Sequence, residues 1–411
     1  MTTSNTTSSA FTLPAGAPSA ARATLKLLLR LKHGTLTVKL PDGSVQRFGN
    51  GQAPQASLHL LNWNVCGAAL KSGDIGFAES YIAGDWTTPH LTDLLQVFIV
   101  NRKEVEDVIY GTWLGRFAYR IKHLLNRNTK ANSQKNIHAH YDLGNAFYEL
   151  WLDGTMNYSS AIFETPETSM KDAQHAKVRR ALRMAQVKPG DRVLEIGCGW
   201  GALAEKATKE FDASVVGVTL STEQLEWAQK RMQAKGVAEK ADLRLQDYRD
   251  IGKTTPDEPF DAICSIEMVE AVGREYWPEY FQTVHRLLKP GGHACIQSIV
   301  IADDLFERYL TSTDFIQQYV FPGGCLPCPK AFRAQVAAAG LELVDEFSFG
   351  LDYAHTLQLW REQFAAQHAH VLQLGFDERF IRIWEFYLSY CEAAFLESNT
   401  DVVQYTLRKP S

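Results

Sequence analysis

The strongest constraint on the fold of this chain is a short apolar segment that runs directly into three closely spaced glycines. The segment VLEIGCGWGALAE, residues 193–205, places Gly197, Gly199 and Gly201 between an expected strand and an expected helix. Glycines let a backbone turn tightly and approach a ligand closely, as they do after the first strand of nucleotide-binding α/β sheets. The segment therefore predicts a binding site at the carboxyl end of a strand.

The spacing of these glycines and the acidic residue before them indicate what the site binds. The pattern is GxGxG rather than the GxGxxG of dinucleotide sites, and Glu195 lies two residues before the first glycine. A carboxylate here would repel a phosphate, whereas it suits the cationic amino group of S-adenosylmethionine. The motif favours a nucleotide ligand without a phosphate.

From about residue 175 onward, apolar strands alternate with helices. The strand candidates are RVLEIG, SVVGVTL, DLRLQDY, FDAICSI and HACIQSI. Such alternation predicts an α/β fold with a mostly parallel, doubly wound, Rossmann-like sheet. Beyond Asp303 we expect helices whose many aromatic residues exceed what such a sheet needs, and Phe315 and Tyr319 are candidates to line a tunnel for an apolar chain.

The ends of the second and third expected strands supply further ligand-binding candidates. In sheets of this type the second strand ends near the ribose and the third near the base. The candidates are Thr219 and Gln224 for the ribose, and Gln246, Asp247 and Tyr248 for the adenine.

The composition indicates a globular protein that does not bind nucleic acid. The chain has 411 residues, a formal net charge of −5 and seven cysteines. Nucleic-acid binders usually carry a basic balance, and an odd, low number of cysteines suits a reducing compartment. The first twenty residues have no basic start and no apolar run, so they are not typical of a secretory signal. We expect a cytoplasmic protein without a metal site.

Changes in pattern along the chain predict four parts. Residues 1–20 have the composition of a disordered tail. Residues 21–115 suggest a small α+β domain with a hairpin around Pro41, Asp42 and Gly43. Residues 116–135 form a basic linker, which is either a membrane-surface segment or a solvated connection. Residues 136–411 form the catalytic domain.

Several longer motifs resemble the cyclopropane-fatty-acid synthase family, which includes the mycolic acid cyclopropane synthases. The motifs are HYDLGNAFYELWLD, MNYSSAIFE, LEIGCGWG, VVGVTLSTEQ, LQDYRD, SIEMVEAVG and FPGGCLP, with LKSGDIGFAESYIAGDW in the first domain. The resemblance implies a class I methyltransferase fold with helical lipid-binding insertions. It also implies methyl transfer from S-adenosylmethionine to the double bond of an unsaturated acyl chain in phospholipid, at the inner face of the membrane. The first domain would then serve membrane docking or assembly of a homodimer.

The resemblance also assigns roles to individual residues. Tyr158 and Ser159 match the pair that closes over the cofactor, and Leu220 joins Thr219 and Gln224 at the ribose. The residues that match the active site around a bound bicarbonate, which the family uses as its base, are Ser160, Glu270, Gln297, Ile299 and Tyr353.

Three positions depart from the family pattern. Ser160 stands where many members have cysteine, and both Gln297 and Ala271 stand where they have histidine. Ser160 and Gln297 retain a hydroxyl and an amide that can bind a small anion, but neither titrates near neutral pH. We therefore expect bicarbonate to be retained, and more than one product remains open.

The expected chemistry leaves alternatives open. Methyl transfer to an alkene produces a carbocation, which Tyr353 can stabilise through its ring. Loss of a proton from the new methyl then closes a cyclopropane, the product we expect. Loss after a hydride shift gives an exo-methylene, a precursor of methyl-branched or furan fatty acids. A methyltransferase of small soluble substrates and a catalytically silent lipid-binding protein are the other interpretations.

Overall fold

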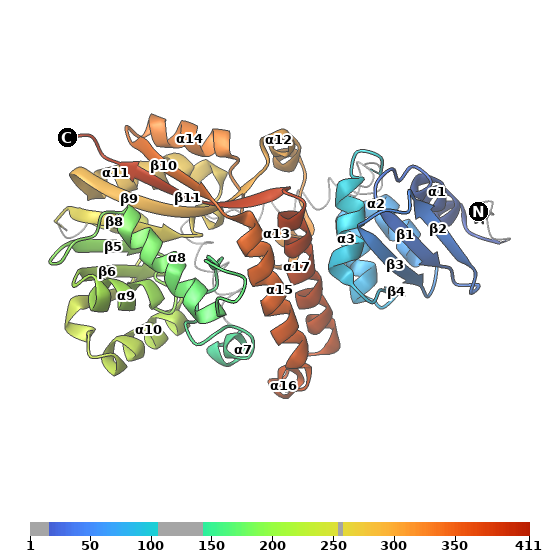
Figure 1. Ribbon diagram of the computed structural model, residues 1–411, viewed down its shortest axis with the longest axis horizontal. Helices are drawn as coiled ribbons and strands as arrows, with labels where there is room; N and C mark the ends of the chain where they lie inside the picture. The colour runs from blue at the N-terminus through green and yellow to red at the C-terminus, as the bar shows by residue number, and fades with distance from the viewer. Residues whose placement is uncertain (1–15, 106–142, 254–257) are drawn as a thin grey trace, which may run out of the picture. The chain divides into compact units, whose positions relative to one another are not determined.

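The computed structural model describes residues 16–105, 143–253 and 258–411 (Figure 1). The chain divides into two compact units, residues 1–118 and 119–411. The predicted basic linker and most of the predicted tail lie outside the described residues. The first described helix, α1 (Ser19–Leu28), begins two residues before the predicted start of the first domain.

The first unit is a small α+β domain built on a four-stranded sheet with the order β2-β1-β3-β4. Its strands are β1 (Thr35–Lys39), β2 (Val45–Gly49), β3 (Gln55–Leu60) and β4 (Trp86–Thr87). Its other helices are α2 (Asn64–Ile82) and α3 (Leu91–Val100). β1 and β2 pair antiparallel, which confirms the hairpin predicted around Asp42, and β1 pairs with β3 in parallel.

A seven-stranded sheet with the order β10-β11-β9-β8-β5-β6-β7 organises the second unit. The strands are β5 (Arg192–Ile196), β6 (Ser214–Thr219), β7 (Ala241–Leu245), β8 (Phe260–Ile266), β9 (Leu288–Ile301), β10 (Glu342–Ser348) and β11 (Thr400–Arg408). β5 to β9 are mutually parallel. The mostly parallel α/β sheet predicted from the alternating pattern is therefore confirmed, and each of the five strand candidates forms one of its strands.

The expectation of only helices beyond Asp303 was wrong. This region contributes β10 and β11, and β11 pairs antiparallel with both β9 and β10. β10 escaped prediction because it is an edge strand whose exposed residues are mostly charged or polar, so it has no apolar run. The two strands extend the sheet beside β9 and bring Gln404 opposite Gln297.

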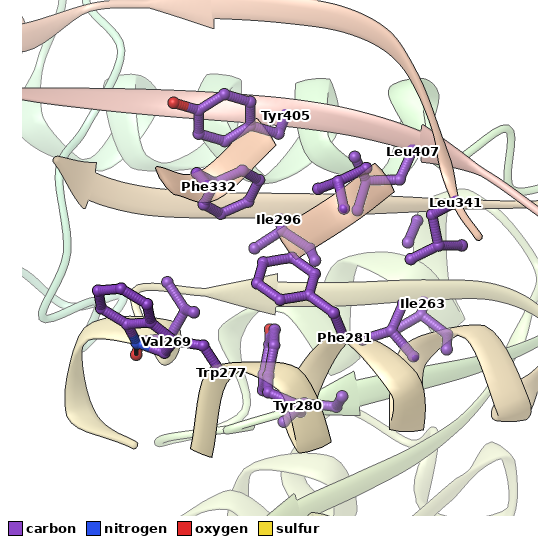
Figure 2. Close-up of a cluster of buried hydrophobic side chains, with 14 of the residues drawn as sticks. Ile263, Val269, Trp277, Tyr280, Phe281, Ile296, Phe332, Leu341, Tyr405 and Leu407 are labelled. Atoms are coloured by element: carbon purple, nitrogen blue, oxygen red, sulfur yellow. Dashed lines mark hydrogen bonds between the residues drawn. The ribbon is translucent and has the colours of Figure 1, made fainter. Parts of the chain in front are cut away.

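Helices cover both faces of this sheet (Figure 1). One face carries α8 (Met170–Met184), α9 (Ala202–Glu210) and α10 (Thr222–Ala234), while the other carries α11 (Trp277–Leu287) and α14 (Pro329–Ala338). Side chains alternate between the two faces along β5, as the two-residue repeat of a strand requires. Val193 packs in the core beneath α8, α9 and α10, and Leu194 packs in the core beneath α11 and α14. In the core beneath α11 and α14, Phe332 stacks on Tyr405 with ring centroids 3.8 Å apart (Figure 2).

The remaining helices gather where the aromatic residues concentrate. The two long ones, α15 (Gly350–Ala366) and α17 (Glu378–Leu396), pack against each other and against β11. The shorter ones are α7 (Asn145–Glu149), α12 (Asp303–Thr311), α13 (Phe315–Tyr319) and α16 (His368–Gln373). Phe315 is fully buried between Tyr319 and Phe386. Within the described parts of the chain, no helix combines the length and apolarity needed to cross a bilayer.

An N-cap stabilises the start of α8, the helix that contacts Ser159. Ser169 caps the helix, because its hydroxyl accepts a hydrogen bond from the amide of Asp172 at 3.2 Å. Further along α8, Gln174 and Lys177 hold Ser159. We expect Ser169→Ala to lower the free energy of unfolding by about 1 kcal/mol, the usual value of an N-cap. Urea unfolding measures this, and an unchanged midpoint would contradict it.

Candidate active site

One cavity at the carboxyl ends of β5, β6 and β7 brings together most of the predicted ligand-binding residues. Eleven of the twelve line it: Tyr158, Ser159, Glu195, Gly197, Gly199, Thr219, Leu220, Gln224, Gln246, Asp247 and Tyr248. Gly201 does not line the cavity. It precedes α9, and a Cβ there would lie 3.1 Å from the Cβ of Ala228 on α10, so this glycine serves helix packing.

The first glycine of the motif adopts a backbone that other residues rarely adopt. Gly197 has φ +84°, and its amide and that of Cys198 both donate to the carbonyl of Val218 at 3.0 Å. A Cβ on Gly197 would lie 2.4 Å from Cγ of Met268, which also lines the cavity. The sequence therefore needs glycine here both for the turn and for the space beside β8.

Glu195 supplies a buried acidic group at the cavity. Its Oε2 has no hydrogen-bond partner among the described residues. Burial raises the pKa of Glu195 to about 8, against the opposing effects of Lys177, the Ala204 amide and Arg231. An unpartnered carboxyl beside a glycine turn fits the ammonium group of S-adenosylmethionine.

The ribose and adenine candidates are partly occupied by contacts within the chain. The hydroxyl of Thr219 lies 3.1 Å from Oε1 of Gln224, and it accepts the amide of Ser221. Asp247 forms a buried ion pair with Arg249, with 2.6 Å between Oδ2 and the guanidinium, so this carboxylate holds the loop after β7. The hydroxyl of Tyr248 is buried without a hydrogen-bond partner in the described structure.

The centre of the predicted catalytic group is a residue that sequence reasoning missed. Glu267, which is not among the residues predicted above, accepts three hydrogen bonds. Its Oε1 accepts the Ser160 amide at 2.9 Å and Nε2 of Gln297 at 2.7 Å, and its Oε2 accepts the Tyr353 hydroxyl at 2.7 Å. Glu267 also lines the cavity. Its position just after β8 is the available signal, because ligands of α/β sheets bind at the carboxyl ends of strands.

Ser160 and Gln297 differ from their expected arrangement. The hydroxyl of Ser160 donates to the carbonyl of Ala161 at 3.0 Å, so its backbone amide, and not its side chain, faces Glu267. Gln297 is fixed at both ends, because its Oε1 accepts Nε2 of Gln404 at 3.0 Å while its Nε2 donates to Glu267. Both residues therefore position one carboxylate.

Glu270 lies in the same region but has a separate partner. Its Oε1 accepts the Ile299 amide at 2.5 Å, and its Oε2 has no hydrogen-bond partner among the described residues. Burial, followed by the charge of Glu267, raises the pKa of Glu270 to about 8. The raised pKa favours the neutral form of Glu270 beside Glu267. The Glu270 carbonyl also accepts the amide of Cys325, which holds the FPGGCLP loop.

Aromatic rings surround the two tyrosines of the site. The hydroxyl of Tyr158 lies 2.7 Å from that of Tyr387, and its ring centroid lies 5.5 Å from that of Trp360. Tyr353 packs against Phe395 at 4.5 Å and edge-on to Trp360 at 6.2 Å. This apolar, electron-rich wall suits a lipid chain and can stabilise positive charge on it.

Cys325 and Cys328 form a CxxC pair that begins within the FPGGCLP loop, and their contacts are structural. Both cysteines are free, and Sγ of Cys328 accepts the amide of Ala331 at 3.4 Å as the N-cap of α14. Burial raises the pKa of the Cys325 thiol to about 12, so it carries no thiolate at neutral pH.

The chain is similar to several known proteins in sequence and in fold. The profile of the family described as mycolic acid cyclopropane synthetase matches residues 128–405. The tuberculostearic acid methyltransferase UfaA1 of Mycobacterium tuberculosis is 36% identical over 404 residues, covering 96% of this chain and 92% of that protein. The cyclopropane-fatty-acyl-phospholipid synthase of Escherichia coli K12 is 35% identical over 348 residues, covering 84% and 86%. A crystal structure of mycolic acid cyclopropane synthase CmaA1 complexed with SAH and CTAB superposes with a TM-score of 0.62 at 32% identity, covering 67% and 98%.

Proposed function

Because this chain belongs to the mycolic acid cyclopropane synthetase family, we propose that it adds one carbon to the cis double bond of an unsaturated acyl chain in membrane phospholipid. The chain is an S-adenosylmethionine-dependent methyltransferase of the cyclopropane synthase type, and lipid acyl chains are its class of substrate. One observation supports addition of a carbon to the acyl double bond. The cavity that contains Glu195 also contains the hydrogen-bonded carboxylate of Glu267, and Glu267 contacts Tyr353 in the aromatic cluster.

Each group in the site has a distinct task in this reaction. S-adenosylmethionine supplies an electrophilic methyl group when it is bound. Glu195 and the turn at Gly197 hold its methionine part, while Thr219 and Gln224 meet its ribose. The rings of Tyr158 and Tyr353 stabilise the carbocation, each by about 1–2 kcal/mol in a desolvated site. The reaction needs no nucleophile from the protein, and a strong nucleophile in contact with the carbocation would form a covalent bond with it.

The proposal has two endings, which differ in how the cation loses its proton. Cyclopropane formation is the ending predicted from the sequence. The exo-methylene ending, leading to methyl-branched or furan fatty acids, stays open because Ser160 and Gln297 depart from the family pattern on the base side of the site. Two relatives that cover most of the chain are also named as fatty acid methyltransferases, from Mycobacterium tuberculosis and Pseudomonas putida.

Product analysis tests the proposal directly. The purified protein is incubated with S-adenosylmethionine and phospholipid vesicles that carry cis-monounsaturated chains. We expect S-adenosylhomocysteine to be released and the acyl chains to gain one carbon by mass spectrometry. Upfield ring-methylene protons in the NMR spectrum identify a cyclopropane, and vinylic protons identify an exo-methylene. Unchanged acyl chains, with S-adenosylhomocysteine still bound by the protein, would refute acyl methyl transfer.

A further inference from the structure

The donors expected to hold a bicarbonate are already occupied by the chain itself. The Ser160 amide, Nε2 of Gln297 and the Tyr353 hydroxyl all donate to Glu267, and the Ile299 amide donates to Glu270. A carboxylate and a bicarbonate present the same planar pair of oxygens to such donors. The residues of this site therefore do not fit an added bicarbonate, because Glu267 takes its hydrogen bonds and adds a repelling charge.

The backbone at Glu267 supports a functional reason for this arrangement. Glu267 has φ +54°, a left-handed conformation that is unfavourable for a residue with a side chain. The conformation is held because the Glu267 amide donates to the carbonyl of Gln297 at 2.8 Å. Strained backbone that persists through such contacts is typical of active sites. In this conformation the carboxylate lines the cavity and accepts hydrogen bonds from Ser160, Gln297 and Tyr353.

We propose that Glu267 is the proton acceptor of this enzyme and replaces bicarbonate in that role. This inference rests on the proposed function, since it concerns the carbocation that methyl transfer produces. One C–H bond of the new methyl breaks, and its proton bonds to a Glu267 oxygen. The electron pair of that bond closes the ring or, after a hydride shift, forms the exo-methylene double bond. The carboxylic acid then releases its proton to solvent once the product has left.

The hydrogen bonds explain why this carboxylate can act as a base without forming an ester with the cation. Three donors occupy lone pairs of Glu267, which lowers its nucleophilicity and fixes its orientation. Burial raises the pKa of Glu267, while Lys177 and the three donors oppose this, so the group is a stronger base than an exposed glutamate. Burial and the charge of Glu267 raise the pKa of Glu270 to about 8, which favours the neutral form of Glu270 beside this base.

Bicarbonate dependence and two substitutions test the proposal. Turnover by the full-length protein is measured with S-adenosylmethionine and dioleoyl phospholipid vesicles, in carbon-dioxide-free buffer and in buffer with added bicarbonate. We expect equal rates for the unmodified enzyme. We expect Glu267→Gln to lose about 10²–10⁴-fold in turnover, the usual contribution of a general base. Glutamine keeps the shape of the side chain, so calorimetric affinity for S-adenosylhomocysteine should stay within a few-fold.

Glu267→Gly distinguishes a catalytic from a structural role. Glycine suits the positive φ and frees the three donors, so added bicarbonate should raise the turnover of this variant at least tenfold. Glu210→Gln is the matched control, because it removes a carboxylate bound by Arg179 and Lys206 outside the cavity. We expect it to keep full turnover.

The outcomes separate this inference from the proposed function. An unmodified enzyme that makes product only with bicarbonate, or a Glu267→Gln variant with full turnover, would overturn the role of Glu267 alone. If added bicarbonate fails to activate Glu267→Gly, the Glu267 carboxylate does not occupy the position of a bound bicarbonate. An unmodified enzyme that binds S-adenosylhomocysteine yet modifies no acyl chain under either condition would overturn the proposed function and this inference together.

Discussion

Replacement of Gly197 by alanine is expected to weaken the binding of S-adenosylhomocysteine by about 10- to 100-fold. The new Cβ would lie 2.4 Å from Cγ of Met268, a residue of the same cavity. The positive φ of +84° also costs alanine about 1–2 kcal/mol in the folded state. Relief of either strain moves the turn or Met268 into the space that the ligand needs, and 1.4 kcal/mol corresponds to a tenfold change in affinity. Isothermal titration calorimetry measures the loss.

Gly190→Ala separates backbone strain from obstruction of the cavity. Gly190 has a similar φ of +86°, but a Cβ there would meet no atom within 4 Å, and Gly190 does not line the cavity. We expect Gly190→Ala to lose free energy of unfolding through its positive φ alone, and Gly197→Ala to lose more because of the added clash with Met268. Gly190→Ala should keep the affinity of the unmodified protein. Equal affinities in the two variants would show that Gly197 has no special relation to the ligand.

The parts of the site that are local in the sequence could be predicted, because local spacing determines them. Gly197 follows β5, Thr219 ends β6 and Gln246 follows β7, so strand ends alone place all three at one edge of a parallel sheet. The same reasoning could not rank Glu267. Its importance comes from Ser160 and Tyr353, which are 107 and 86 residues away in the sequence.

Two other differences have equally physical causes. Ser160 was judged by its hydroxyl, but its backbone amide makes the contact with Glu267, and amides are common to nearly every residue. β11 has the β-branched and aromatic residues typical of a strand, so its local pattern indicates a strand within a region that we expected to be helical. β11 contributes to the site through Gln404, whose Nε2 donates to Oε1 of Gln297. Nε2 of the same Gln297 side chain donates to Glu267.

Glu195→Gln is expected to weaken S-adenosylhomocysteine binding at pH 8 by about 10- to 100-fold and to remove the rise in affinity between pH 6 and 8. A hydrogen bond to a charged group contributes about 1.5–3 kcal/mol, and the ligand ammonium loses this partner. Burial raises the pKa of Glu195 to about 8, so below that pH the empty site holds a neutral carboxyl. Binding of a cation must then displace a proton, and affinity should rise by up to ~10-fold per pH unit towards pH 8.

The shape of the pH profile assigns the titration to Glu195. The ammonium group of the ligand keeps its proton throughout pH 6 to 8, because the neighbouring carboxylate of its own amino-acid part stabilises the charged form. Affinity for the unmodified protein should therefore rise with pH up to about 8 and then level off, whereas the affinity of Glu195→Gln should be flat between pH 6 and 8. Lys177 titrates in the same range, since burial lowers its pKa to about 8, and therefore a ligand control is needed. 5′-Methylthioadenosine lacks the amino-acid part, so its affinity should not change between pH 6 and 8. If its affinity rises as steeply as that of S-adenosylhomocysteine, the proton is lost elsewhere and Glu195 does not bind the ammonium group.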